Sequence, residues 1–74
     1  MRKQKASDIA AKVGNNLRYA RKRAGLTQKQ LAEELNKRQA DYSNYETGRL
    51  ELDYEKIVYL CKRLNVTPDD LFDF

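Results

Sequence analysis

The sequence predicts an all-α protein built from five helices. Turn signals divide the 74-residue chain into pieces of helical length, and they lie at Ala24-Gly25, Asn36, Thr47-Gly48 and Asn65. Within the pieces, apolar residues recur at three- and four-residue steps, without the alternation of a half-buried strand. No repeat or low-complexity tract interrupts this pattern. We therefore expect a single domain at residues 7–74, preceded by a flexible basic arm at residues 1–6.

The residue types limit which sites this short chain can build. It contains one cysteine, Cys61, and no histidine, so we expect no disulfide, no metal site and no cofactor. The longest apolar run, at 57–61, is too short to span a bilayer, and no apolar stretch follows the basic start as in a secretory signal. These features predict a cytoplasmic protein with no membrane partner.

Charge is distributed unevenly along the chain. Residues 1–49 hold twelve Lys and Arg against five Asp and Glu, a balance of +7, and residues 50–74 hold three against six, a balance of −3, which together give the net +4. A polyanion would bind the basic part, because each phosphate that a cation neutralises releases counterions. The alternative is that these cations only solvate helix surfaces.

The first two predicted helices have clear ends. The first runs from Ser7 or Asp8 to Ala24, with Gly25 in the left-handed position after it. Gly14 costs ~1 kcal/mol relative to alanine inside a helix, so a start near Gly14 is the alternative. The apolar stripe of this helix is Ile9, Val13, Leu17, Ala20 and Ala24. The second helix begins at Thr27, which forms a capping box with Gln30, and its buried edge is Leu31, Ala32 and Leu35.

Three further helices complete the prediction. Asn36 and Asn65 mark helix ends, because asparagine tolerates the left-handed conformation. The third helix spans about 39–46, with an inward face of Tyr42 and Tyr45 and an outward face of Gln39, Ala40, Ser43 and Asn44. The fourth follows the cap Asp53 and spans about 54–64, with a predicted buried face of Tyr54, Ile57, Val58, Cys61 and Leu64. The last spans 67–72, with Pro68 in its first turn.

Three segments of this pattern resemble the Cro and phage-repressor (XRE-type) helix-turn-helix DNA-binding family. They are Gly25-Leu-Thr-Gln-Lys-Gln-Leu-Ala-Glu-Glu-Leu35, Tyr45-Glu-Thr-Gly-Arg49 and Leu64-Asn-Val-Thr-Pro-Asp-Asp-Leu-Phe72, and the resemblance covers about residues 13–72 without gaps. It implies a five-helix phage-repressor-like domain. In such a domain the third helix is the recognition helix and the second lies across its back.

The resemblance implies a sequence-specific double-stranded DNA-binding transcriptional regulator of bacterial or phage type, expected to be a repressor. A helix in the major groove offers base edges its outward, N-terminal side chains. Here the base-contacting candidates are Gln39, Ala40 and Asn44, flanked by Arg38 and Ser43. Amide groups match adenine N6 and N7, and alanine can pack on a thymine methyl. The alternative is that the exposed amides serve only solubility.

The family pattern also implies contacts to the DNA backbone. Gln28 is expected to grip a phosphate, at a helix end that presents free N–H groups, and to brace Gln39. The turn after the third helix should approach the other phosphate run through Thr47, Gly48 and Arg49. Further candidates, alternatively plain solvated charges, are Arg18, Lys22, Lys29 and Lys37. The arm at 1–5 either tracks a groove or is a disordered tail.

Arg21 and Glu46 are expected, by the same resemblance, to form a structural ion pair between the first and third helices, since an arginine fork meets a carboxylate bidentately.

Three residues depart from the family pattern. Lys37 replaces a buried aliphatic residue, and Arg38 replaces the usual Ser or Thr cap. Asp41 either caps the free N–H groups of its helix or accepts from a cytosine amine.

A homodimer on a palindromic operator is expected, because one domain reads only about four or five base pairs and half-sites lie about one helical turn apart. Surplus apolar side chains predict a dimer interface in the acidic half, made of Leu50, Leu71, Phe72 and Phe74, with Val58 or Tyr59 as further members. The alternative function is a helix-turn-helix protein-interaction module, antitoxin-like or an adaptor, which Asp41 and the acidic tail favour.

An enzyme is not expected. The chain has no histidine, no nucleophile paired with a base and no glycine-rich phosphate loop, and no small-molecule ligand is evident. Cys61 falls on the predicted buried face of its helix, where cysteine behaves as a small hydrophobe.

Overall fold

The computed structural model describes residues 6–73, with side chains from Asp8 onward, and this part of the chain contains five helices and no strand. They are α1 (Ala6–Arg23), α2 (Gln28–Glu34), α3 (Gln39–Thr47), α4 (Tyr54–Leu64) and α5 (Pro68–Phe72). The predicted all-α class is confirmed. Residues 1–5 of the predicted basic arm lie outside the described residues, and Ala6 already belongs to α1.

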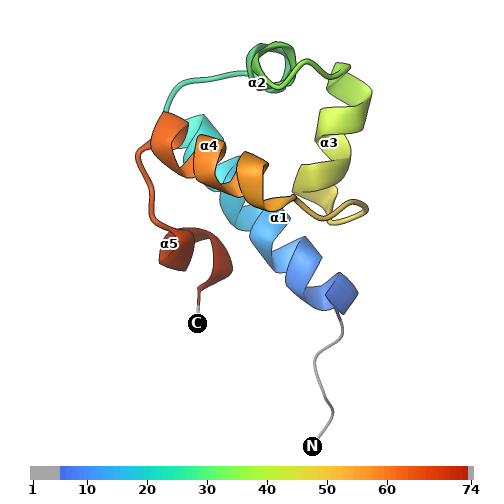
Figure 1. Ribbon diagram of the computed structural model, residues 1–74, viewed down its shortest axis with the longest axis vertical. Helices are drawn as coiled ribbons and strands as arrows, with labels where there is room; N and C mark the ends of the chain where they lie inside the picture. The colour runs from blue at the N-terminus through green and yellow to red at the C-terminus, as the bar shows by residue number, and fades with distance from the viewer. Residues whose placement is uncertain (1–5, 74) are drawn as a thin grey trace, which may run out of the picture.

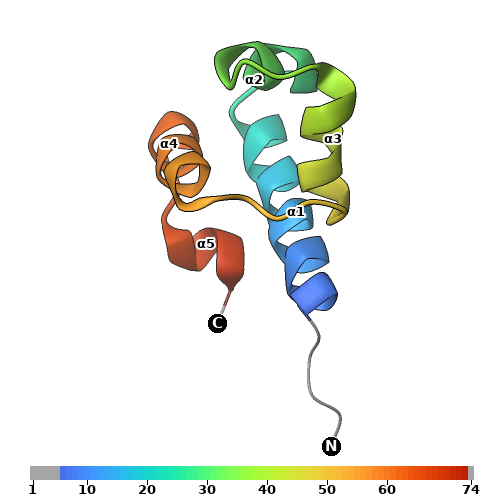
Figure 2. The ribbon, with the colours of Figure 1, turned by 45° about the vertical axis from the view of Figure 1, so that its right-hand side comes forward.

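The helices surround α1. It packs against α3 and α5, and α2 packs against α3. Figures 1 and 2 show α2 across one end of the molecule next to α3, with α4 and α5 on the side of α1 away from α3. None of the helices within residues 6–73 combines the length and the apolar character needed to cross a membrane.

Gly14 lies inside α1 and does not begin it. A Cβ at this position would collide with the carbonyl oxygen of Tyr45 and would lie 2.6 Å from that of Glu46. The missing side chain therefore lets α1 approach the last turns of α3. This close packing outweighs the low helix propensity of glycine.

One apolar cluster holds the five helices together. Each helix contributes one large, fully buried side chain to it: Leu17, Leu31, Tyr42, Leu60 and Leu71. Burying a side chain of this size stabilises a fold by about 1.5–3 kcal/mol. The core is thus shared by all the helices, and α3 packs directly against α1 and α2.

Several predicted core positions are exposed. On α1, Ile9 is 42% exposed, and Ala24 lies in the turn after the helix, where it is exposed too. On α4, Tyr54 and Val58 are 88% and 53% exposed, whereas Leu60, which the sequence pattern did not select, is fully buried. Apolar residues cover much of the circumference of α4, so periodicity alone could not choose the buried arc.

The ends of the helices follow the predicted signals. Thr27 and Gln30 form the capping box, with Gln30 N–H donating to Thr27 Oγ1 at 3.0 Å and Thr27 N–H donating to Gln30 Oε1 at 2.7 Å. Asn36 and Asn65 adopt φ angles of 59° and 57°, in the left-handed region. The short connection between Leu35 and Arg38 therefore joins α2 to α3 as a helix-turn-helix unit.

Candidate nucleic-acid interface

α3 presents its N-terminal half to solvent. Gln39 and Ala40 are exposed, whereas Ser43 and Asn44 are half-buried. Tyr42 and Tyr45 are both buried, as predicted. The freest outward side chains of α3 are therefore the two at its start.

Arg38 and Asp41 form a pair at this exposed end. Arg38 Nε donates to Asp41 Oδ2 at 3.0 Å, and the side chain of Arg38 is 84% exposed. Of the two alternatives for Asp41, the capping of its own helix is wrong, since its carboxylate binds the Arg38 guanidinium instead. A charged donor makes a stronger hydrogen bond to a carboxylate than a neutral one does.

Gln28 and Gln39 lie together between the starts of α2 and α3. Gln39 Nε2 donates to Gln28 Oε1 at 3.4 Å. Gln28 is half-buried and Gln39 is exposed. The brace between the two glutamines is therefore present in the protein without DNA.

Glu46 is the centre of a buried hydrogen-bond network behind this pair. Its Oε2 accepts from Arg21 Nε and from the Tyr42 hydroxyl, both at 2.7 Å. Its Oε1 accepts from Arg21 Nη2 at 3.2 Å and from Gln28 Nε2 at 2.9 Å. Arg21 also donates to the carbonyl oxygen of Leu26 at 2.9 Å. The expected Arg21–Glu46 pair is therefore formed, and it joins α1, α2 and α3.

The network holds fixed charge states. Burial alone would raise the pKa of Glu46, but hydrogen bonds from Arg21, Gln28 and Tyr42 outweigh it and hold that pKa below its usual value. Burial, with the hydrogen bond to Glu46, raises the pKa of Tyr42. At neutral pH Glu46 is thus an ionised carboxylate, which can only accept hydrogen bonds.

The turn after α3 is organised by the carbonyl oxygen of Asn44. It accepts from the backbone N–H groups of Gly48, Arg49 and Leu50, the last two at 3.0 and 3.1 Å. Gly48 has φ 83°, and a Cβ there would lie 2.7 Å from the backbone nitrogen of Ala11. The turn is therefore pressed against α1, with the side chain of Arg49 exposed.

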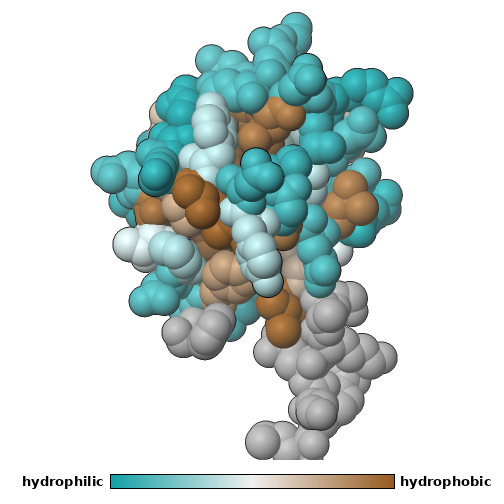
Figure 3. Space-filling model, viewed as in Figure 1, coloured by the Kyte–Doolittle hydropathy of each residue, from teal (hydrophilic) through white to brown (hydrophobic). Residues whose placement is uncertain are grey.

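Five basic side chains, including that of Arg49, were candidates for phosphate contacts. Lys37 is half-buried, while the exposed ones are Arg18, Lys22, Lys29 and Arg49. The ion pairs observed within residues 8–73 use other cations. The charges of the four exposed side chains are thus available to an anion, whereas Asp53, whose pKa is lowered mainly by hydrogen bonds from Lys56, also interacts with the charge of Lys37. Figure 3 shows a largely hydrophilic face, on which apolar side chains form separate small patches.

The predicted dimer residues lie in different environments. Leu71 is fully buried in the core of the monomer, so its assignment to an interface is wrong. The residue faces α1, where Asn16 Nδ2 donates to its carbonyl oxygen at 2.7 Å. Leu50 is 47% exposed and Phe72 is half-buried. Phe74 lies outside the described residues.

The sequence pattern did not predict a second polar cluster, which joins α2 to α4. Glu34 at the end of α2 accepts from Arg63 Nε at 2.9 Å and from the Tyr59 hydroxyl at 2.6 Å, both on α4. These partners are 29 and 25 residues away in the sequence. No local spacing signals such a contact, and only the fold brings the groups together.

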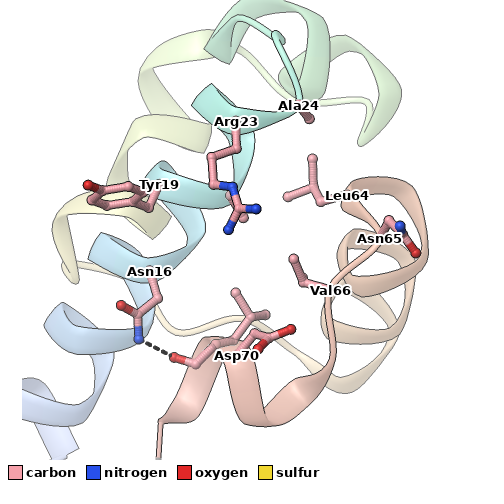
Figure 4. A pocket seen from close by; sticks show the side chains of 10 residues that line it. Asn16, Tyr19, Arg23, Ala24, Leu64, Asn65, Val66 and Asp70 are labelled. Carbon is pink, nitrogen blue, oxygen red and sulfur yellow. Dashed lines mark hydrogen bonds between the residues drawn. The ribbon is translucent and has the colours of Figure 1, made fainter.

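A cleft of about 490 Å³ lies between α1, the end of α4 and α5. Figure 4 shows Asn16, Tyr19 and Arg23 of α1 on one side of it, opposite Leu64 and Val66. None of its lining residues belongs to α2 or α3. The cleft is therefore separate from the surface formed by the two helices of the helix-turn-helix unit.

Comparison with known proteins agrees with this architecture. A family model described as "Helix-turn-helix" matches residues 17–71. The HTH-type transcriptional regulator ImmR of Bacillus subtilis (strain 168) is 39% identical over 59 residues, which cover 80% of this chain and 46% of that protein. The chain thus spans about half the length of this curated relative. No solved structure gives a significant match. The chain belongs to the helix-turn-helix family, in its Cro and XRE type, a family of DNA-binding regulators.

Proposed function

We propose that this chain is the sequence-specific double-stranded DNA-binding domain of a transcriptional regulator, with α3 in the major groove. The observation that carries the proposal is the exposed start of α3. Gln39 and Ala40 face solvent there, and the helix is held from behind by the buried Arg21–Glu46 pair. A rigid helix with free polar side chains at its N-terminal end is the arrangement that reads base edges.

Gln39 is the principal base-reading residue in this proposal. Its amide matches the N6 and N7 edge of adenine, and Ala40 next to it offers a methyl to thymine. Asn44 and Ser43, which are half-buried, read the edges of the same site, and Arg38 flanks it. Because Asp41 engages Arg38, the reach of this arginine toward DNA requires the exposed pair to open.

Two surfaces on either side of α3 hold the phosphates. Gln28 donates to one phosphate through the side-chain N–H that it does not donate to Glu46, and the backbone N–H groups at the start of α2 bind the same phosphate. The turn at Thr47, Gly48 and Arg49 approaches the other phosphate run. Arg18 and Lys37 extend the contacts to the backbone.

We further propose that the regulator is a repressor that binds a palindrome as a homodimer. Leu50, Phe72 and Phe74 remain the interface residues, without Leu71. Leu50 and Phe72 line a small cavity of about 190 Å³, together with the exposed Ile9 and Tyr54. Sedimentation should show a dimer on operator DNA, and Leu50→Glu should reduce it to a monomer. A strict monomer with and without DNA would remove the dimer from the proposal.

Selection of duplexes from a random library tests DNA reading directly. A palindromic site should be enriched, and Gln39→Ala should cost ~1–3 kcal/mol on that site while relaxing one base pair. Arg49→Ala is the matched control, since it should weaken binding to all sequences alike and flatten the salt slope by about one unit. An unchanged affinity of Gln39→Ala for the best site would refute the placement of α3.

The second candidate function is a protein-interaction module. The carboxylate of Asp41 at the exposed end of α3 favours it, because it neutralises the Arg38 guanidinium that would otherwise attract phosphates. The salt dependence of binding to random duplex DNA separates the two functions. Several phosphate contacts give a log–log slope of about −0.9 for each, whereas a slope near zero would favour the interaction module.

A further inference from the structure

The hydrogen bonds that lead from Glu46 to Gln39 have only one consistent direction. An ionised carboxylate only accepts, so Gln28 must turn its NH₂ group toward Glu46, as the 2.9 Å contact shows. The carbonyl oxygen of Gln28 then points the other way and accepts from Gln39 Nε2 at 3.4 Å. The amide orientation of Gln39 is thus set, through Gln28, by Glu46, whose side chain is only 2% exposed.

This direction decides what Gln39 can offer to a base. Its Nε2 lies on the side of Gln28, which is the side of the DNA backbone in the proposed complex, and its Oε1 is left for the middle of the groove. Adenine and guanine both carry the acceptor N7 toward the backbone. They differ at the middle of the groove, where adenine has the N6 donor and guanine the O6 acceptor.

We propose that Glu46 is a positioning residue that makes Gln39 select adenine over guanine, through Gln28. This inference rests on the proposed DNA-binding function and deepens it. Gln39 Oε1 accepts from adenine N6, and the second N–H of Gln39 donates to N7. Against guanine, the same oxygen would face the O6 acceptor. The base preference at this position therefore originates in a carboxylate that never reaches the DNA.

Glu46→Gln should reverse the chain of hydrogen bonds. The oxygen of the new amide should take the Oε2 position, where Arg21 Nε and the Tyr42 hydroxyl both donate at 2.7 Å. Its NH₂ group then replaces Oε1, where the longer 3.2 Å contact from Arg21 Nη2 is given up, and it faces Gln28, which must turn its own oxygen toward it. Gln28 would donate to Gln39 Oε1, and Gln39 would present its NH₂ group to the middle of the groove, where guanine O6 accepts.

Tyr42→Phe is the matched control. It also removes one hydrogen bond from the same carboxylate, but it leaves Glu46 ionised and therefore leaves the direction of the remaining bonds unchanged. A loss of stability alone would act alike in both variants. A change of base preference in Glu46→Gln only is the signature of positioning.

The test uses the full chain and duplexes that differ in one base pair of the selected site. The relevant pair is the one at which Gln39→Ala loses selectivity. Wild type and Tyr42→Phe should prefer adenine over guanine there by about tenfold. Glu46→Gln should lose this preference or favour guanine. Thermal unfolding of each variant confirms that it is folded at the temperature of the assay.

Two results would overturn the inference: a wild-type preference for guanine, or an adenine preference that survives in Glu46→Gln. A second readout needs no DNA. NMR of the free protein should place the side-chain amide protons of Gln28 beside Glu46 in wild type and beside Gln39 in Glu46→Gln. If those protons already face Gln39 in wild type, the inference fails, whatever the DNA assay gives. An absence of any salt-dependent DNA binding would instead refute the proposed function.

Discussion

Two arginine–glutamate pairs each join two helices of this domain, and they differ mainly in their access to water. Arg21 and Glu46 link α1 to α3 with an N–O distance of 2.7 Å. Arg63 and Glu34 link α4 to α2 at 2.9 Å. A tyrosine hydroxyl donates to each carboxylate, from Tyr42 at 2.7 Å and from Tyr59 at 2.6 Å.

The side chain of Glu46 is 2% exposed and that of Glu34 is 27% exposed. A charge that loses its partner in the protein interior keeps its full desolvation cost, whereas an exposed charge returns to water. An arginine, a glutamate and a tyrosine therefore form a strongly stabilising buried cluster around Glu46 and a weakly stabilising surface cluster around Glu34. Only the buried pair is connected, through Gln28, to the exposed start of α3.

The largest expected effect is that of Arg21→Ala. Removing this guanidinium leaves Glu46 buried without its counter-charge, so the free energy of unfolding should fall by ~3–5 kcal/mol. Urea denaturation measures it, and Arg63→Ala is the matched change at the exposed pair. Equal losses in the two variants would show that burial does not separate the pairs.

Tyr42→Phe should have the next largest effect. The hydroxyl donates to a charged and buried acceptor, and such a bond contributes roughly 1.5–3 kcal/mol. Tyr59→Phe removes the corresponding bond at the exposed cluster, and its unfolding midpoint should stay close to that of wild type. A larger loss in Tyr59→Phe than in Tyr42→Phe would contradict this order.

The pH dependence of stability should follow the same comparison. The pKa of Glu46 is lower in the folded than in the unfolded protein, so its contribution is complete above the usual value of 4.5 and is lost as the pH falls through the folded pKa. The stability difference between wild type and Glu46→Gln should therefore shrink below pH 4.5. The pKa of Glu34 is lowered too, by hydrogen bonds from Arg63 and Tyr59. Solvent screens the Glu34 pair, so the stability difference between wild type and Glu34→Gln should change less with pH than that of Glu46→Gln. Urea denaturation between pH 3 and pH 7 (about the range over which carboxylates titrate) measures both differences.

The smallest effect should be that of Arg63→Ala. Because the pair is exposed, salt screens its attraction, and the Debye length at 1 M is only about 3 Å. Any difference from wild type at low salt should disappear in 1 M NaCl (roughly the limit of this screening), while the deficit of Arg21→Ala should persist. Denaturation curves at two salt concentrations decide this.

Local signals predicted much of the fold. Thr27 with Gln30 marked the start of α2, and Gly25, Asn36 and Asn65 marked helix ends, because caps and left-handed residues act over three or four neighbouring positions. The Arg21–Glu46 pair came from the family resemblance and is present. The residue roles in DNA binding stay predictions.

Contacts across the fold were predicted less well. Leu71 was assigned to a dimer surface but is fully buried, and Val58, which was placed on the buried face of its helix and also offered as a further interface residue, is exposed. Both lie in apolar stretches in which the sequence pattern offers more hydrophobic residues than one helix face can bury. One of the two alternatives for Asp41 was that it caps its helix, yet the longer Arg38 side chain provides a charged donor to it.

By itself, the sequence determined which residues form helices and where these helices end, since these properties depend on neighbouring residues. Only the tertiary structure decided which arc of α4 is buried, that Gly14 lets α1 touch α3, and that Gln28 forms hydrogen bonds with both Glu46 and Gln39. The physical reason is that desolvation and hydrogen-bond direction depend on groups distant in the chain, and these meet only when the helices pack.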